Sequence, residues 1–505
     1  MRSRRTTTLT VVLSALAILA LIAPPAFAAD LAESKGFRKA VTLAGIREHQ
    51  AALQDIADDN NDTRSSGTPG YEASAHYVRD RLEAAGYAVT LQPFAFAFYR
   101  QLAPSTFART SPIPFTYTEG ASADYTPMTY SGSGDVTAPV STVLNLGCDA
   151  TDFAGFTAGR IALISRGTCT FAIKAANAQA AGASAVVIYN NAPGQLNGTL
   201  GAPNYTIPVL GTTQAIGQDN AALVPVGLTF HIVTSTESQT RTTWNVIAET
   251  ASGDPNKVVV VGAHLDSRLE GPGINDNGSG SATILEIAET FAAQKRVARN
   301  KLRFMWYGAE EFNLLGSTAY VNGLSEDQVG DIMAMVNFDM VGSPNYVRFV
   351  YDGDNSAFPV GPGAAEGPPG SAFLETMFVD YFNAVGLASD PTPFSGRSDY
   401  GPFIAVGIPA GGLFTGAEGI KTAAQAATYG GQAGIAYDPC YHQACDTYAN
   451  NSNTGLDQMS DAAAHVVLTL SRTKVDVRET EAVAALRTSG SRVADAPGPE
   501  ELATR

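Results

Sequence analysis

Carboxylate and imidazole side chains follow three apolar runs of the chain, at residues 257–262, 302–307 and 333–338. In chain order, the groups that follow these runs are His264, Asp266, Asp276, Glu310, Glu311 and Asp339. Continuous apolar runs of this kind are typical of buried parallel strands, whose carboxyl ends meet at one edge of a sheet, so we expect these side chains to lie close together. Burying so many acids is costly unless a cation offsets their charge. The sequence therefore predicts a site for a divalent cation.

His442 lies far downstream, between Cys440 and Cys445, and adds a second imidazole to the set. Imidazole and carboxylate ligands without thiolate favour Zn²⁺ with positions left open for water and substrate. Asp266 is expected to hydrogen-bond the second ring nitrogen of His264 and so orient the ring. Taken alone, this pair also fits a loop histidine beside a capping aspartate. The other histidines lie in helical or strand patterns and are interpreted as structural: His49, His76, His231 and His465.

Composition and charge exclude other classes of function. The chain has 505 residues and is 45% hydrophobic, which excludes a wholly disordered protein and predicts two or three domains. A formal charge of −16 makes nucleic acid and anionic membranes poor partners. The sequence contains neither the H-E-x-x-H motif of thermolysin-type sites nor a G-x-S-x-G nucleophile elbow.

The first 28 residues have the pattern of a secretory signal peptide. The basic start MRSRR precedes an apolar run from Leu9 to Ala23, and Ala26-Phe27-Ala28 matches a small-x-small cleavage site. An amphipathic first helix of the fold is the alternative. The apolar run is too short to span a bilayer, so we expect a secreted protein without a membrane anchor.

Four cysteines remain after this segment, and an even number in an exported chain predicts two disulfides. Three pairings are possible, and proximity in sequence favours Cys148–Cys169 and Cys440–Cys445. A cysteine-rich zinc site is the alternative, but the spacing of the two pairs does not fit it well.

Alternating strand and helix patterns predict the fold class. Helices are expected at 71–85 and 279–294, and a strand at 87–93. With the three apolar runs, this order predicts an α/β fold in which helices cover both faces of a mainly parallel mixed sheet.

Residues 130–235 differ, because their short apolar runs and sparse charges predict a smaller β-rich domain inserted into the fold. The main domain is then discontinuous, with parts at 29–125 and 240–474. Residues 475–505 lose the apolar pattern and are predicted to be a mobile tail.

Long motifs around the candidate ligands resemble a known enzyme family. In order they are GTPGYEASAHYV, GAHLDS, GINDNGSGSA, LRFMWYGAEEFNLLGS, NFDMVGSP, FSGRSDYGPF, GGLFTGA and YDPCYHQACD. They resemble the secreted bacterial di-zinc, leucyl-type aminopeptidases, which are related more distantly to glutamate carboxypeptidase and glutaminyl cyclase. The match is continuous over residues 240–470. Residues 130–235, with GRIALISRGTCTF and AGASAVVIYNN, resemble the protease-associated (PA) domain that is often inserted into such peptidases.

The resemblance implies which residues hold two zinc ions per chain. It assigns His264 and Asp339 to one zinc. Glu311 and His442 belong to the other. Asp276 is the implied bridge between the two ions, and the peptide bond after it is expected to be cis.

The resemblance also implies a mechanism. Glu310 is the implied general base for a zinc-bound hydroxide that attacks the peptide carbonyl, and Tyr441 is implied to polarise that carbonyl. The expected substrates are peptides with a free N-terminus, and the sequence names no protein partner.

Three positions match residues that line an apolar pocket in similar enzymes: Met340, Tyr351 and Phe414. They imply a preference for large apolar N-terminal residues, and ordinary core packing is the alternative. Arg397 is expected either to contact the substrate or to pair with Asp399.

Several alternatives stay open. A glutaminyl cyclase-like transferase shares the fold but uses one zinc, and a carboxypeptidase for acidic peptides needs several arginines where the sequence offers only Arg397. Asp457 and Asp461 suggest a calcium site as a weaker prediction, because acids near a helix N-terminus are common without calcium.

Overall fold

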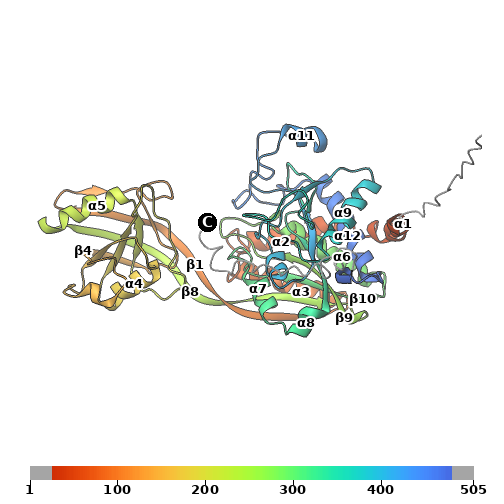
Figure 1. Cartoon of the computed structure of the whole chain (residues 1–505), viewed down its shortest axis with the longest axis horizontal. Helices are drawn as coiled ribbons and strands as arrows, with labels where there is room; N and C mark the ends of the chain where they lie inside the picture. Colours follow the sequence, from red (N-terminus) through yellow and green to blue (C-terminus); the bar gives the residue numbers. More distant parts are fainter. Residues whose placement is uncertain (1–25, 480–505) are drawn as a thin grey trace, which may run out of the picture.

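The computed structural model describes residues 26–479. Most of the predicted signal peptide and of the predicted tail lies outside the described residues. The described chain forms two bodies joined by a long two-stranded ribbon (Figure 1). The ribbon consists of β1 (Ala88–Ser111) and β8 (Thr229–Glu249), which pair antiparallel along nearly their whole length.

A mixed sheet forms the centre of the larger body. In spatial order its strands are β13 (Asp390–Thr392), β12 (Phe349–Tyr351), β14 (Ala410–Phe414), β11 (Ile332–Phe338), β9 (Asp254–His264), β10 (Asn300–Tyr307) and β8. The central strand β9 is parallel to β10 and β11, and β11 is parallel to β14. The three apolar runs are therefore adjacent strands of one parallel array, as predicted.

Helices cover both faces of this sheet, which confirms the predicted fold class. Val259 and Val261 of β9 belong to the core on one face, and Val258 and Val260 belong to the core on the other. Since alternate residues of a strand point to opposite faces, the buried stretch 258–263 of β9 is apolar at every position. The first core is covered by α1 (Ala26–Arg38), α2 (Leu43–Asp58), α3 (Pro69–Ala84), α6 (Gly278–Ala293), α9 (Ser371–Ala384) and α12 (Asn453–Arg472). The second core is covered by α7 (Leu315–Asn322), α8 (Glu326–Asp331) and α10 (Tyr400–Ala405). The remaining helix of this body, α11 (Ala423–Tyr429), follows β14 in sequence and precedes α12.

The smaller body is the inserted β-rich unit. It contains β2 (Phe115–Thr116), β3 (Tyr125–Pro127), β4 (Gly134–Thr142), β5 (Ile161–Ser165), β6 (Ala185–Tyr189), β7 (Val209–Thr212), α4 (Phe171–Ala180) and α5 (Gln214–Leu223). Its core includes Phe107, Tyr117 and Tyr125, which the predicted boundary at residue 125 places in the main domain. The unit therefore begins within β1, earlier in the chain than predicted.

The length of β1 explains this difference. The sequence predicts a strand only over residues 87–93, from their alternating pattern. In the structure β1 continues through Pro93 and Pro104 for 24 residues. β1 pairs with β8 on one side and only with the short β2 near its far end, and prolines are tolerated in such edge strands.

Both predicted disulfides are present. Cys148–Cys169 ties the start of α4 to the loop before β5, and Cys440–Cys445 encloses Tyr441 and His442 in a short loop. No described cysteine is free.

The two ends of the described chain pack against the larger body. Helix α1 begins at Ala26, so the predicted cleavage position after Ala28 lies inside a helix, and Phe37 near its end is fully buried. Val477 is also fully buried, so the packed chain continues past the predicted start of the tail at residue 475. None of the helices within residues 26–479 has the length and apolar character to cross a membrane.

The contact between α1 and α12 yields a prediction about pH. Burial and the charge of Arg38 lower the pKa of His465 from 6.5 to about 4, and its Nδ1 lies 2.8 Å from the Ser34 hydroxyl. The unfolded chain therefore binds a proton at a pH where the folded chain does not. The stability that the neutral histidine contributes is complete above pH 6.5 and is lost as the pH falls towards 4.

We expect His465→Asn, whose amide can still bond Ser34, to lessen the loss of unfolding free energy between pH 7.5 and 4.5 by up to about 3 kcal/mol. Urea unfolding of chelator-treated protein at each pH measures this difference. Equally steep declines for the variant and the wild type would contradict the assignment.

Candidate metal centre and active site

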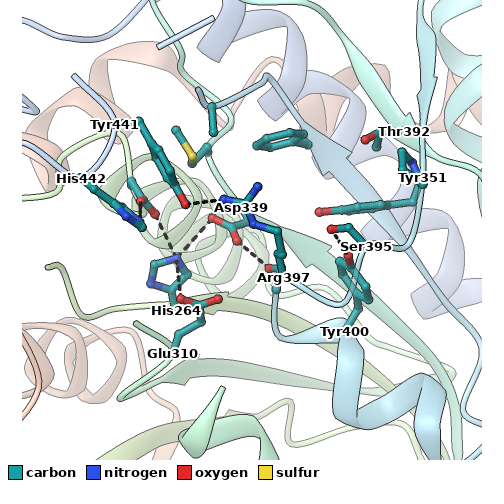
Figure 2. A pocket seen from close by; sticks show the side chains of 16 residues that line it. His264, Glu310, Asp339, Tyr351, Thr392, Ser395, Arg397, Tyr400, Tyr441 and His442 are labelled. Carbon is teal, nitrogen blue, oxygen red and sulfur yellow. Dashed lines mark hydrogen bonds and ion pairs between the residues drawn. The ribbon is translucent and has the colours of Figure 1, made fainter. Parts of the chain in front are cut away.

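The carboxyl ends of the central strands bring the predicted ligands together. His264 ends β9, Asp339 directly follows β11, and Glu310 lies in the loop after β10. All three side chains are buried, and they line one pocket with Asp276 and His442 (Figure 2).

The ligands form two groups that share Asp276. In the first, the Nε2 atom of His264 lies 3.2 Å from Asp276 Oδ1 and 3.2 Å from Asp339 Oδ1. In the second, the Nε2 atom of His442 lies 3.2 Å from Asp276 Oδ2 and 3.2 Å from Glu311 Oε2. Asp276 thus directs one carboxylate oxygen to each imidazole, and the Asp276–Asn277 peptide bond is cis as expected.

These distances fit a divalent cation in each group. Nitrogen and oxygen ligands about 2 Å from a tetrahedral zinc lie about 3.3 Å from one another. Two buried carboxylate oxygens, Asp276 Oδ2 and Glu311 Oε1, form no hydrogen bond of acceptable geometry, although the His442 ring lies beside the first. Buried carboxylate oxygens without donors are destabilising, and a cation beside them removes that cost. The donor set of imidazole and carboxylate therefore fits zinc.

The ionisable groups perturb one another strongly. Burial, reinforced by Asp276, raises the pKa of Glu311 to about 7, and burial raises the pKa of Glu310 well above its usual range. Burial opposes the charged form of His442, but Asp276 and Glu311 raise its pKa to about 9. In the absence of a cation, the centre therefore retains protons near neutral pH. Binding of a divalent ion would release those protons.

Asp266 has a different role from the predicted one. The Nδ1 atom of His264 lies 3.1 Å from the backbone oxygen of Asp266 and 3.7 Å from its Oδ1. The carboxylate oxygen Oδ1 instead accepts a hydrogen bond from the backbone N–H of Glu310, at 3.2 Å. The backbone of Asp266 thus faces the histidine ring, and its side chain holds the segment that carries Glu310.

Arg397 and Tyr441 meet at the pocket. Arg397 Nη2 donates to the Tyr441 hydroxyl at 3.1 Å (Figure 2). Its Nη1 donates to Glu418 at 2.7 Å. The alternative pairing of Arg397 with Asp399 is wrong, since Glu418 takes that position and Asp399 is fully buried. The ring of Tyr441 stacks on His442 with centroids 3.7 Å apart.

The three predicted pocket residues line the same pocket as the ligands. Met340, Tyr351 and Phe414 lie beside Tyr400 and Pro393, which the sequence analysis did not assign to the site. An apolar wall thus adjoins the metal centre. Tyr400 belongs to the quoted motif FSGRSDYGPF, so the motif contained the signal for it.

Other residues that support the ligands were also not predicted. The Ser398 hydroxyl donates to Asp339 Oδ2 at 2.5 Å and accepts from the Asn337 amide at 2.7 Å. The carboxylate of Asp446 accepts from the backbone N–H groups of Asn275 and Asp276, at 2.8 and 2.9 Å. These bonds fix the positions of Asp339 and Asp276, two of the three residues of the first ligand group.

The predicted calcium site gains no support. Asp461 lies 3.4 Å from the guanidinium of Arg38. Within residues 26–479, neither Asp457 nor Asp461 belongs to a cluster of three potential metal ligands.

Comparisons with known proteins agree with this geometry. A model described as peptidase family M28 matches residues 245–467, and a PA domain model matches residues 134–219. An aminopeptidase of Pseudomonas aeruginosa is 46% identical over 460 residues, which cover 87% of this chain and 83% of that protein. A leucine aminopeptidase 2 of Arthroderma otae is 42% identical over 420 residues, covering 82% of this chain and 80% of that protein.

Solved structures show the same similarity. An aminopeptidase from Aneurinibacillus sp. strain AM-1 aligns with a TM-score of 0.61 and 28% identity, covering 88% of this chain and 97% of that chain. A zinc aminopeptidase from Bacillus subtilis aligns with a TM-score of 0.57 and 25% identity, covering 86% and 97%.

The buried acids predict that metal removal destabilises the protein. A cation that binds only the folded protein adds about 4 kcal/mol to the free energy of unfolding when its free concentration is about 1,000 times its Kd. We expect 1,10-phenanthroline followed by dialysis to lower the Tm by about 5 °C or more, and added zinc to restore it. Calorimetry with parallel metal analysis measures both. An unchanged Tm in protein shown to be free of metal would contradict the fit.

Proposed function

Because the chain belongs to peptidase family M28 and is a metallo-aminopeptidase, we propose that it removes N-terminal residues from peptides at a centre of two zinc ions. One observation carries the proposal: two ligand groups share Asp276, which directs one oxygen to each, beside an apolar pocket. The signal sequence and two disulfides support secretion as part of the proposal.

Five side chains would hold the two ions: His264, Asp276, Glu311, Asp339 and His442. When bound, the ions lower the pKa of water and polarise the scissile carbonyl. The protein's own contribution is to orient the substrate and move the protons.

Glu310 is the proposed general base. Its carboxylate lies in the pocket, 3.9 Å from His264 Nε2, and its backbone is held by Asp266. With the two ions bound, this buried carboxylate beside the proposed ligands would take the proton of the attacking water. It then delivers that proton to the leaving amine.

Tyr441 is the proposed donor to the developing oxyanion. Burial raises the pKa of its hydroxyl, which therefore keeps its proton at neutral pH. Arg397, which donates to the Tyr441 oxygen, leaves the tyrosine proton free to point elsewhere. A donor fixed in this way stabilises charge without having to reorganise.

The pocket supports a preference for large apolar N-terminal residues. Met340, Tyr351 and Phe414 form its apolar wall, and several relatives are named leucine aminopeptidases. A free α-ammonium would find the carboxylates of Glu310 and Asp339 beside this wall. The relatives give no comparable support to the glutaminyl cyclase-like or carboxypeptidase alternatives.

The proposed division of the chain follows the two bodies. The peptidase part comprises the larger body, and the PA domain comprises the smaller body together with the second half of β1 and the first part of β8.

An assay on aminoacyl-nitroanilides tests the proposed function. We expect purified mature protein to hydrolyse leucyl-nitroanilide faster than the alanyl compound, to lose this activity on chelation, and to regain it with zinc. Metal analysis should give two zinc ions per chain. Cleavage of N-acetylated substrates would rule out an aminopeptidase, and a single zinc would rule out the two-ion centre.

Glu310→Gln tests the general base. The amide keeps the size of the side chain but cannot take a proton, so we expect kcat to fall by at least about 100-fold. Zinc content and Tm should stay near those of the wild type, because Glu310 is not a proposed ligand. Near-normal kcat would contradict the assignment.

A further inference from the structure

A buried segment between α2 and α3 contacts the loops that carry the metal centre. The segment comprises Thr63, Arg64, Ser65 and Ser66, each at most 5% exposed. The Thr63 hydroxyl donates to the Arg268 carbonyl at 2.9 Å, and the Ser66 hydroxyl accepts from the Ala309 N–H at 2.7 Å. The segment therefore touches the loop that follows β9 and His264, and the loop after β10, which contains Glu310.

Arg64 makes the largest number of these contacts. Its Nη1 donates to the Leu265 carbonyl at 2.5 Å. Its Nε donates to Pro272 at 2.8 Å, and Nη2 donates to Gly273 at 2.6 Å. All three guanidinium nitrogens thus bind backbone carbonyls, and none forms an ion pair with a carboxylate within the described chain.

The three carbonyls lie on two stretches that carry ligands of the same zinc. Leu265 follows His264 directly, and Gly273 lies three residues before Asp276. The backbone of Arg64 adds a further tie, because its N–H donates to the Ser267 hydroxyl at 3.0 Å. That hydroxyl also lies 2.9 Å from the Gly271 carbonyl. A single rigid guanidinium therefore sets the separation between the two stretches.

The charge of Arg64 also suits this position. Burial lowers its pKa to about 10, while Asp266, Asp446 and Asp276 raise it, so the guanidinium stays charged at neutral pH. One fixed positive charge then partly offsets the acids of the centre when no metal is bound.

We propose that Arg64 is a positioning residue that fixes the spacing of His264 and Asp276 and thereby the zinc affinity of their site. The inference rests on the proposed two-zinc function and deepens it. Residues that orient metal ligands from outside the ligand set change metal affinity by about 10–100-fold when replaced. Lysine keeps the charge but has one nitrogen, so it cannot hold three carbonyls in a fixed arrangement.

The test compares zinc affinities of Arg64→Lys, Arg64→Gln and the wild type. Metal-free proteins are titrated with zinc against a chromogenic chelator, which reports two dissociation constants without any assay of activity. We expect both variants to bind one of the two zinc ions about 10–100-fold more weakly. Saturating zinc should restore part of the activity that the variants lose at limiting zinc, because the ligands themselves are intact.

Arg348→Lys is the matched control. Arg348 is also buried, and it donates to the Ala388 carbonyl and to Gln458, residues that do not line the metal pocket. We expect its replacement to change the Tm without changing zinc affinity. A loss of zinc affinity equal to that of the Arg64 variants would show a general effect of lost stability and overturn the proposal.

Other outcomes also decide the question. Zinc affinities within twofold of the wild type in folded Arg64 variants would overturn the proposal. A wild-type zinc affinity in Arg64→Lys alone would also overturn it, because lysine cannot hold all three carbonyls. If both Arg64 variants fail to fold, Ser267→Ala removes only the hydroxyl between Arg64 and Gly271, and an unchanged zinc affinity there would overturn it. A wild type that binds fewer than two zinc ions refutes the proposed function itself, whereas two tight zinc ions with unaffected variants refute only the role of Arg64.

Discussion

The structure depends on the repulsion and desolvation of carboxylates that are buried at one edge of a sheet. Three parallel strands end there, and their loops largely bury the carboxylates of Asp276, Glu310, Glu311 and Asp339. Two imidazoles and a buried guanidinium offset part of this charge, and protons retained by the glutamates offset more. The negative charge that is left over favours binding of cations at the centre. It also places a carboxylate, the proposed base Glu310, beside the substrate pocket.

The sequence predicted that His264 and the carboxylates would lie close together because their placement follows from strand geometry, whereas their individual roles as zinc ligands came from the family resemblance and stay a proposal. An apolar run long enough to be buried on both faces ends where its neighbours end, so His264 and Asp339 had to meet. The supporting contacts could not be predicted in this way. Arg64 binds carbonyls about 200 positions away, as the separations of 201 to 209 residues show, and no local pattern reports such a contact. The atom of Asp266 that faces His264 likewise depends on backbone geometry that spacing alone does not specify.

The fold was predicted where helices and strands follow the usual periodicities, and missed where tertiary context overrides local rules. Helices α3 and α6 and the three central strands lie within a few residues of their predicted bounds. The strand predicted at residues 87–93 continues to Ser111 in β1, and its prolines are tolerated there because β1 lies at an edge over most of its length. Phe107 of β1 packs in the core of the smaller body, outside the range 130–235 predicted for the inserted unit.

The ribbon of β1 and β8 has a consequence for how such a chain can be rearranged. The polypeptide leaves the larger body along one strand and returns along its direct partner, with Phe98 opposite Gln239 and Tyr99 opposite Ser238. Joining the two strands by a tight hairpin at this level would excise the whole accessory module while leaving the pairing from Ala88↔Glu249 onwards intact. None of the six residues proposed as zinc ligands or general base belongs to the excised stretch. Removal of the module at this level would therefore leave uncut every segment that carries a proposed zinc ligand or the proposed general base.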